Sequence, residues 1–268
     1  MLTVLERRVM MHPRGCMKMS TLRSKLSRNL HLEIRPARND DWLAIERLLS
    51  YADRHYLALE WWTIQEWLGS PTFLLATDPH ERCVGLMLTV IGDGPVGWLR
   101  AVNVFSDDYL APLLKASVEA TREQGATGFA FLGNERWLVS KLSQADFCQV
   151  NRVVTLRHCG LPSVQHRPPG VKVRAATAAD IDAILNVDHA SFTPIWWYSS
   201  RVLRRALNMA CSFDVAHIEG QCVGYQLSTL QRGRGHIVRL ATHPHWQRQG
   251  IGGQLLSGAM KALDAAGA

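Results

Sequence analysis

The sequence predicts an α/β (α+β) fold made of two tandem units, each a mixed β-sheet flanked by helices. The first observation behind this prediction is that similar segments recur along the 268 residues at a constant spacing. The second is that short strand-like runs alternate with helical stretches in both halves. The third is a strand, a glycine-bearing turn and a helix in direct succession at residues 235–242, 247–252 and 253–266.

An internal repeat with an offset of 139 residues defines the two units. Two tryptophan pairs, 61–62 and 196–197, recur as well, with an offset four residues shorter. Three separate matches in one register are hard to obtain by chance, so we expect two copies of one fold. The matched pairs are residues 34–45 and 173–184, residues 83–85 and 222–224, and Arg100 and Arg239.

The repeat sets the expected domain boundaries and the order of elements. The copies are expected at residues 32–158 and 171–268, with a proline-rich and therefore extended linker at 159–170. Each copy begins with a strand, followed by a helix that Asn39/Asp40 or Thr177 caps, a second helical stretch and a β-hairpin. The expected strands are 32–36, 72–76 and 83–90 in the first copy, and 171–175, 213–218 and 221–228 in the second.

The glycine-bearing turn has the chemistry of a phosphate site. It reads Gln247-Arg248-Gln249-Gly250-Ile251-Gly252, and its glycines let backbone N–H groups approach an anion at the positive end of the next helix. The Lys-Ser/Thr of a P-loop is missing, and the spacing is not that of a dinucleotide fingerprint. The turn resembles the acetyl-CoA pyrophosphate loop of the GNAT acyltransferases, and the order β-α-α-β-β-β-α is also that of the GNAT fold.

This resemblance implies a set of residues that hold acetyl-CoA as co-substrate. The backbone of Leu240, Ala241 and Thr242 is expected to run along the pantetheine arm, and the N–H near Leu240 to donate to the oxyanion. Arg248 either adds a direct charge or is a solvated surface arginine. The residues implied to surround the pyrophosphate are Gln247, Arg248, Gln249, Gly250, Ile251, Gly252 and Gly253.

The catalytic acid and base are not identified by the sequence. The predicted strand 235–242 offers His236 and Arg239 but no carboxylate, and His236 is more simply explained as an exposed residue at the strand end. In the family, a tyrosine on the fourth helix often protonates the thiolate. The second copy stops at residue 268, before the strand, helix and strand expected at 128–132, 135–142 and 150–156 of the first copy. We therefore expect a truncated second domain that is a poor enzyme.

The first copy lacks the phosphate turn. Residues 104–112 contain no glycine, and Asp107 and Asp108 lie where a pyrophosphate would be bound, so their charges would repel it. The first copy is therefore expected to be degenerate and structural.

The segment Asp188–Tyr198 is expected to be the loop that shapes the acceptor pocket. Its Ser-Phe followed by tryptophan resembles the RimI-type enzymes, which acetylate protein N-termini. Packing in the core explains the same aromatic residues equally well, and the candidates are Phe192, Trp196, Trp197 and Tyr198. The expected function is acetyl-CoA-dependent N-acetyl transfer to a primary amine, of a small molecule or a protein N-terminus. A non-catalytic acyl-CoA-binding or interaction protein is the alternative.

Composition excludes other classes of protein. The net charge of +7 is concentrated in residues 1–30, which carry +6, and this segment is expected to be a disordered basic leader. Nucleic acid is therefore not an expected partner, although a basic arm that binds RNA remains an alternative. Six scattered cysteines indicate a reduced, cytoplasmic protein without zinc, and His243 and His245 lack a third metal ligand. No apolar run approaches the roughly 18 residues of a membrane span.

Overall fold

The computed structural model describes residues 3–12, 31–59, 61–158, 160 and 168–268, and the chain divides into two compact units. We call residues 2–157 the first unit and residues 158–268 the second unit. The division falls just before the predicted linker at 159–170, most of which lies outside the described residues. No helix among the described residues is long and apolar enough to cross a membrane.

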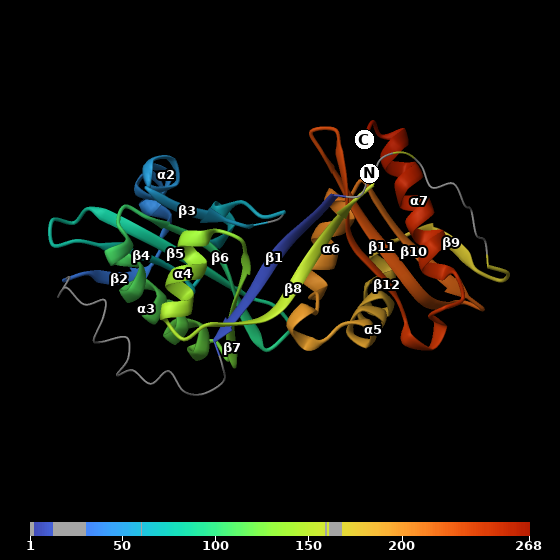
Figure 1. Cartoon of the computed structure of the whole chain (residues 1–268), viewed down its shortest axis with the longest axis horizontal. Coiled ribbons are helices and arrows are strands. Elements are labelled where there is room, and N and C mark those ends of the chain that lie inside the picture. The colour runs from blue at the N-terminus through green and yellow to red at the C-terminus, as the bar shows by residue number, and fades with distance from the viewer. Residues whose placement is uncertain (1–2, 13–30, 60, 159, 161–167) are drawn as a thin grey trace. The chain divides into compact units, whose positions relative to one another are not determined.

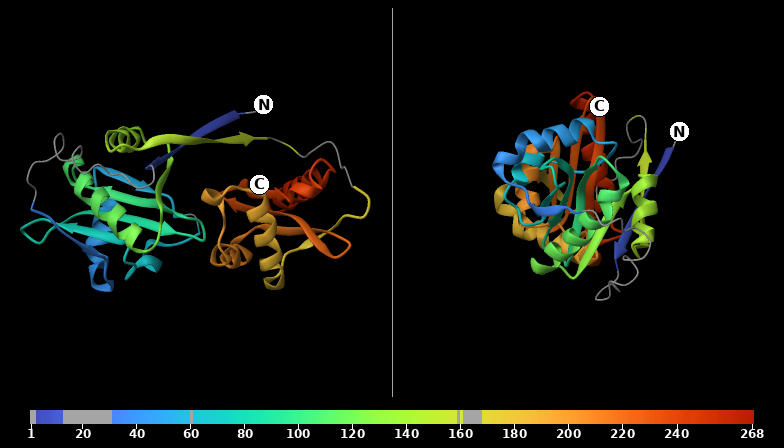
Figure 2. Two further views of the ribbon diagram at one scale, coloured as in Figure 1. Left: turned by 90° about the horizontal axis from the view of Figure 1, so that it is seen from below. Right: turned by 90° about the vertical axis from the view of Figure 1, so that its left-hand side faces the viewer.

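The first unit is a mixed eight-stranded sheet with helices on both faces (Figures 1 and 2). Its strand order is β2-β4-β5-β6-β7-β1-β8, with β3 added beside β6, and only β6 and β7 pair in parallel among its described strands. The strands are β1 (Thr3–His12), β2 (Glu33–Pro36), β3 (Arg54–Leu57), β4 (Phe73–Thr77), β5 (Cys83–Ile91), β6 (Val96–Val104), β7 (Gly128–Gly133) and β8 (Cys148–Arg157). The helices are α2 (Trp42–Tyr51), α3 (Leu110–Glu123) and α4 (Arg136–Gln144).

Alternation along the central strands gives this sheet two apolar faces. Leu86 and Leu88 of β5 pack with α2 in one core cluster, whereas Met87 packs with α3 and α4 in the other. A strand buried on both faces reads as a continuous apolar run, as β5 does.

Strand β1 corrects the prediction of a disordered leader. Residues 3–12 lie between β7 and β8 and pair with both in antiparallel register. Val9 and Met10 are buried. The prediction was wrong because it weighed the net charge of the segment above its apolar pattern. The strand pairs on both sides and buries Val9 and Met10, which directly follow Arg7 and Arg8. The remaining leader, residues 13–30, lies outside the described residues.

The second unit is a four-stranded antiparallel sheet, in the order β12-β11-β10-β9 over its described strands. Helices α5 and α7 cover opposite faces of this sheet. A Cβ on Gly224 of β11 would touch Ile251 and Leu255 of α7, whereas the next residue, Tyr225, reaches α5. The elements are β9 (Lys172–Ala175), α5 (Ile181–Ser191), α6 (Ser200–Met209), β10 (Ser212–Ile218), β11 (Gln221–Gln231), β12 (Arg234–Thr242) and α7 (Ile251–Ala265).

The predicted repeat has a counterpart in the contacts of each unit. Arg35 binds Asp41 through two hydrogen bonds of 2.8 and 2.7 Å, and Arg174 binds Asp180 with the same two distances. Each pair links a strand, β2 in the first unit and β9 in the second, to the short 3-10 turn that follows it. Asp180 also accepts from the N–H and the hydroxyl of Thr177, the predicted cap. In the first unit Asp41 accepts from the N–H of Arg38, and Arg38 holds the cap position that was predicted for Asn39 or Asp40. The α/β fold class predicted from the sequence is thus confirmed.

We predict that Met10→Ala lowers the free energy of unfolding of the first unit by about 2–5 kcal/mol, because a buried side chain is removed from the sheet. Urea denaturation of the full chain measures the change. Arg7→Ala, at an exposed position of the same strand, is the matched control and should stay within about 0.5 kcal/mol. If both substitutions had equally small effects on stability, residues 3–12 would not form part of the folded sheet, and the prediction of a disordered leader would hold.

Candidate functional site

The turn between β12 and α7 has the backbone of an anion site. A short 3-10 turn at Pro244–Trp246 is followed by Arg248 and Gly250, both with positive φ, of 65° and 84°. Helix α7 has no side-chain cap, and the N–H of Gln254 donates to the carbonyl of Gly250 at 3.0 Å. The N–H groups of residues 251–253 therefore belong to the first helical turn, which has no intrahelical acceptors and carries partial positive charge.

Glycine is required by the backbone conformation at only one of the three glycine positions in this turn. Gly250 is left-handed, a conformation that strains other residues. A Cβ on Gly252 would meet only the Thr242 hydroxyl at 3.5 Å, an ordinary contact, and a Cβ on Gly253 would meet nothing within 4 Å. No close contact among the described residues requires glycine at 252 and 253. Their missing side chains leave space beside the first-turn N–H groups.

The carbonyl of Thr242 anchors the turn. It accepts from the Ser191 hydroxyl at 3.2 Å and from the Gln247 side-chain amide at 3.1 Å. The glutamine of the motif therefore braces the turn against the end of β12 with its side chain. Arg248 and Gln249 are exposed.

Strand β12 presents alternate backbone groups to its outer edge. The N–H of His243 donates to Val223 on β11, so the groups of Thr242 and Leu240 point away from β11. A register shift opposite Leu227 and Ser228 leaves Val238 as an extra residue, a β-bulge two residues before Leu240. The Leu240 N–H thus lies at the outer edge of the described sheet, next to a local irregularity.

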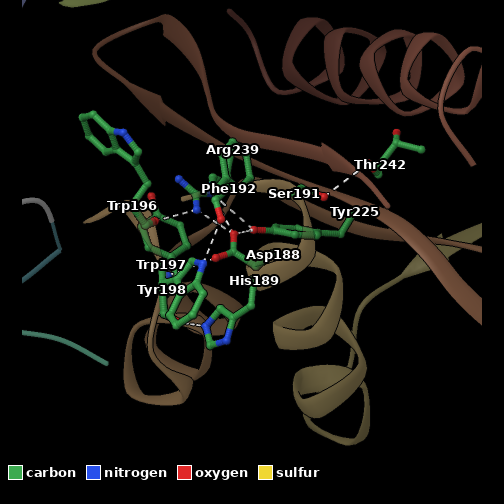
Figure 3. A network of polar contacts seen from close by, with 10 residues as sticks. All are labelled: Asp188, His189, Ser191, Phe192, Trp196, Trp197, Tyr198, Tyr225, Arg239 and Thr242. Atoms are coloured by element: carbon green, nitrogen blue, oxygen red, sulfur yellow. Dashed lines mark hydrogen bonds and ion pairs between the residues drawn. The ribbon is translucent and has the colours of Figure 1, made fainter. Parts of the chain in front are cut away.

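A buried ion pair joins β12 to α5 (Figure 3). Arg239 donates from Nε to Oδ1 of Asp188 at 2.8 Å, and its Nη2 lies 2.7 Å from the same oxygen. The Tyr225 hydroxyl of β11 donates to that oxygen too, and the backbone N–H of Tyr198 donates to Oδ2 at 3.0 Å. The Asp188 side chain is fully buried, so its charge is balanced within this network.

The guanidinium of Arg239 also holds the segment after α5. It lies 3.6 Å from the ring centre of Phe192 and 4.3 Å from that of Tyr198, and it donates to the Trp196 carbonyl at 2.7 Å. Trp197 donates from its indole to the Phe192 carbonyl at 2.9 Å and stacks on His189 at 4.3 Å. Arg239 thus contacts the rings of Phe192 and Tyr198 and the carbonyl of Trp196, while Trp197 is held by Phe192 and His189. All four predicted acceptor residues are half-buried.

The charges of Asp188 and Arg239 and the protonated Tyr225 hold one another in place, and we call these three residues the buried clamp. Burial and the neighbouring Asp188 raise the pKa of Tyr225, so this phenol stays protonated at neutral pH. Burial lowers the pKa of Arg239, but the adjacent Tyr225 and Asp188 outweigh it and the net shift is upward. All donors to Asp188 are supplied by the protein itself, so we assign this carboxylate to positioning and not to proton transfer.

The structure does not bring His236 together with the turn. His236 is exposed and is the cross-strand partner of Thr229 on β11. It lies near the start of β12, six residues before Thr242. That separation corresponds to about 20 Å along a strand. The structure instead shows that Asp188 and Tyr225, which the sequence did not indicate, are the buried partners of Arg239. Residues 188–191 also complete α5 and are not part of a loop, which corrects that prediction. Asp188 could have been predicted from the sequence, because its carboxylate lies on the same helix face as the buried Ile184 and Val187.

The corresponding turn of the first unit is occupied by its own side chains. Asp107 accepts from Nε of Arg54 at 2.9 Å and lies 3.2 Å from Nζ of Lys141. The hydrogen bond from Arg54 lowers the pKa of Asp107, which keeps the carboxylate charged. Ser106 accepts from the N–H of Asp108 at 3.2 Å.

Part of the chain is similar in sequence to known acetyltransferases. Residues 210–268 match the model of the acetyltransferase (GNAT) domain. The chain is 28% identical over 104 residues to an N-alpha-acetyltransferase of Sulfolobus acidocaldarius, and 30% over 105 residues to that of Sulfurisphaera tokodaii. Each match covers 34% of this chain, and the chain spans 61% and 62% of the two relatives' lengths. Residues 210–268 of the second unit thus carry the similarity to the GNAT acetyltransferase domain that the sequence predicted.

A solved structure is similar to most of the chain. The GCN5-related N-acetyltransferase of Sphaerobacter thermophilus matches with a TM-score of 0.54 and 14% identity, covering 88% of this chain and 84% of that one. At this identity the likeness shows the fold alone. It extends over both units, including the one that the family model does not match.

We predict that Asp188→Ala destabilises the second unit by about 3–5 kcal/mol, because it leaves the largely buried Arg239 without its counter-ion. Thermal or urea unfolding of the full chain measures the loss. Asp182→Ala, on the exposed side of the same helix, is the control and should change stability little. A small effect at Asp188, equal to that at Asp182, would show that the ion pair does not hold the unit together.

Proposed function

We propose that the second unit binds acetyl-CoA and transfers its acetyl group to a primary amine. One observation carries the proposal: the first turn of α7 presents uncapped N–H groups beside two glycines that no close contact within the described chain requires. A diphosphate fits such a site because it accepts from backbone donors and is stabilised by the helix dipole. The GNAT domain match over residues 210–268 includes this turn.

The proposed cofactor site continues from the turn along β12. The pyrophosphate would contact the segment Gln247–Gly253, and the pantetheine arm would follow the outer edge at Leu240, Ala241 and Thr242. The outward carbonyl of Leu240 and the outward N–H of Thr242 supply an acceptor and a donor for the amides of that arm, since the Thr242 carbonyl already accepts from Ser191 and Gln247. The Ala241 side chain is buried in the unit and therefore does not cover the backbone groups at the outer edge of β12.

The proposed reaction is direct acyl transfer. The neutral amine attacks the thioester carbonyl, the C–N bond forms and the C–S bond breaks. The proton that the amine loses ends on the departing sulfur, so that CoA is released as the free thiol. The N–H of Leu240 is the proposed donor to the oxyanion, a role for which a fixed donor at a strand edge is suited. Proton transfer is not assigned to Asp188 or Tyr225, because both are engaged in the buried clamp.

The proposed acceptor is a protein N-terminus. Two relatives are named N-alpha-acetyltransferases, and the segment Phe192–Tyr198 forms a rigid aromatic surface next to β12. Because Arg239 fixes this segment and precedes Leu240, the acceptor surface and the proposed oxyanion donor are held by consecutive residues. The aromatic side chains are suited to the apolar parts of a peptide.

A second candidate, a non-catalytic acyl-CoA-binding protein, is favoured by one observation. No carboxylate lies on β12, and the buried Asp188 and Tyr225 are both engaged. Acetyl-CoA consumption by the full chain with a panel of N-terminal peptides and small amines separates the candidates. Peptide-dependent release of free CoA supports the enzyme, whereas tight binding without any turnover supports the second candidate.

We predict that Gly252→Asp weakens acetyl-CoA binding by at least tenfold, because each charge-assisted hydrogen bond that is lost costs roughly 1.5–3 kcal/mol. Isothermal titration of the full chain gives the affinity, and circular dichroism checks the fold. Gly258→Asp introduces the same side chain at an exposed position of the same helix. Equal affinity of the two variants would show that the turn is only a structural cap.

We also propose that the first unit is a degenerate copy without a cofactor site. Its turn contains Asp107, whose charge is already paired with Arg54 and Lys141. Titration of the full chain should therefore give one acetyl-CoA per chain. A stoichiometry of two, or binding that survives in the Gly252→Asp variant at full strength, would contradict a single site.

A further inference from the structure

Strand β6 of the first unit and strand β12 of the second can be aligned through one backbone hydrogen bond. The N–H of Phe105 donates to the carbonyl of Val84 on β5 at 3.1 Å, as the N–H of His243 donates to that of Val223 on β11 at 2.9 Å. Both strands also have a β-bulge five residues before this donor. The alignment differs by one residue from the offset of 139 found in the sequence, because the first unit has the longer hairpin loop.

This alignment identifies the counterparts of the two residues at the proposed pantetheine edge. Counted back from the aligned donors, Val104 corresponds to Thr242 and Val102 corresponds to Leu240. The backbone groups of Val102 and Val104 point away from β5, by the same alternation as in β12. In the second unit these groups lie at the outer edge of the described sheet, whereas in the first unit they face another strand.

Strand β3 occupies this edge in the first unit. It pairs with β6 in antiparallel register, with Arg54 opposite Val104 and Tyr56 opposite Val102. The backbone groups that we propose as partners of the pantetheine arm in the second unit are therefore paired with the protein's own chain in the first.

Strand β3 lies where β6 and β7 separate. Parallel pairing joins residues 96–98 of β6 to residues 128–130 of β7. Further along, the Tyr56 hydroxyl donates to the Leu132 carbonyl on β7 at 3.0 Å, and the Tyr56 ring meets Phe131 edge-on with ring centres 5.0 Å apart. Strand β3 thus contacts both strands and fills the space between them.

The beginning of β3 also closes the turn that follows β6. Nε of Arg54 lies 2.9 Å from a carboxylate oxygen of Asp107, and Nζ of Lys141 on α4 lies 3.2 Å from the other oxygen. The Arg54 guanidinium also lies 6.0 Å from the ring centre of Trp137 on α4. From the turn to the middle of β6, this strand and its arginine follow the path that we propose for the cofactor in the second unit.

We propose that β3 closes a vestigial cofactor edge in the first unit by occupying it, and that release of β3 exposes an edge that binds a pantetheine arm. The inference rests on the proposed binding of this arm at β12. It goes beyond the charge of Asp107, which opposes only the pyrophosphate. Occupation by β3 excludes a ligand that has no phosphate at all.

Few side chains hold β3 in place. Of its four residues Tyr56 alone is buried, at 5% exposure, whereas Leu57 is 54% exposed. The ion pair of Arg54 with Asp107 lies at the surface, where such pairs contribute little. A strand with one buried side chain has low local stability, so a single substitution should release it.

Hydrogen exchange of backbone amides, followed by NMR on the full chain without ligand, measures the occupancy of the edge. We expect Val102 and Val104 to be protected, and Tyr56→Ala to speed their exchange at least tenfold because the strand then opens more often. Tyr51→Ala, at a 74% exposed tyrosine of α2 in the same unit, is the matched control and should leave both amides unchanged. Fast exchange in the parent, or equal exchange in the two variants, would overturn the proposal.

A milder variant guards against unfolding of the first unit. The amide of Leu86 in β5 should stay protected in Tyr56→Ala if the sheet remains folded. If it does not, Arg54→Gln replaces that variant, because it removes only a surface ion pair. Arg54→Gln should speed exchange of Val102 and Val104 by roughly threefold, and no change would overturn the proposal.

Pantetheine, which has the arm but no pyrophosphate, probes the edge itself. Added to the full chain, it should shift the amides of Leu240 and Thr242 in the parent, and those of Val102 and Val104 as well in Tyr56→Ala. If Leu240 and Thr242 respond but Val102 and Val104 of the released chain do not, this inference fails and the proposed function stands. If Leu240 and Thr242 do not respond either, the proposed cofactor edge of the second unit fails with it.

Discussion

The buried ion pair between Arg239 and Asp188 is the interaction on which the organisation of the second unit depends. Asp188 is fully buried and the Arg239 side chain is 10% exposed, so neither charge is stable there without the other. The pair joins α5 to β12, takes in the Tyr225 hydroxyl from β11 and holds the segment after α5 through Phe192 and Tyr198. A single charge pair thereby fixes three elements and an otherwise irregular segment relative to each other.

Strand β12 connects this pair to the proposed chemistry. Arg239 points its side chain to the α5 face, the next residue presents its backbone to the outer edge, and Thr242 leads into the turn before α7. The β-bulge at Val238 lies at the start of this stretch. In the function proposed here, acceptor surface, oxyanion donor and cofactor turn follow one another along a few residues of one strand, so their spacing is set by strand geometry.

The sequence predicted what local pattern determines. The hairpins, the turn at Gln247–Gly252 and the helix after it could be read from glycine positions and periodicity, and the structure has them with shifts of a few residues at their ends. Long-range contacts were not readable. Nothing local indicates that Tyr225 and Arg239 meet Asp188, and the charge of residues 1–30 concealed β1, whose partners β7 and β8 lie more than a hundred residues away.

Backbone amide shifts of the isotopically labelled full chain, followed by NMR during addition of acetyl-CoA, show which residues the cofactor contacts. If the turn before α7 holds the pyrophosphate, the largest changes fall on the N–H groups of Ile251, Gly252 and Gly253, with further changes at Leu240 and Thr242, and residues 106–109 of the first unit do not respond. Large changes at residues 106–109 with no response in the turn before α7 would contradict this placement of the pyrophosphate.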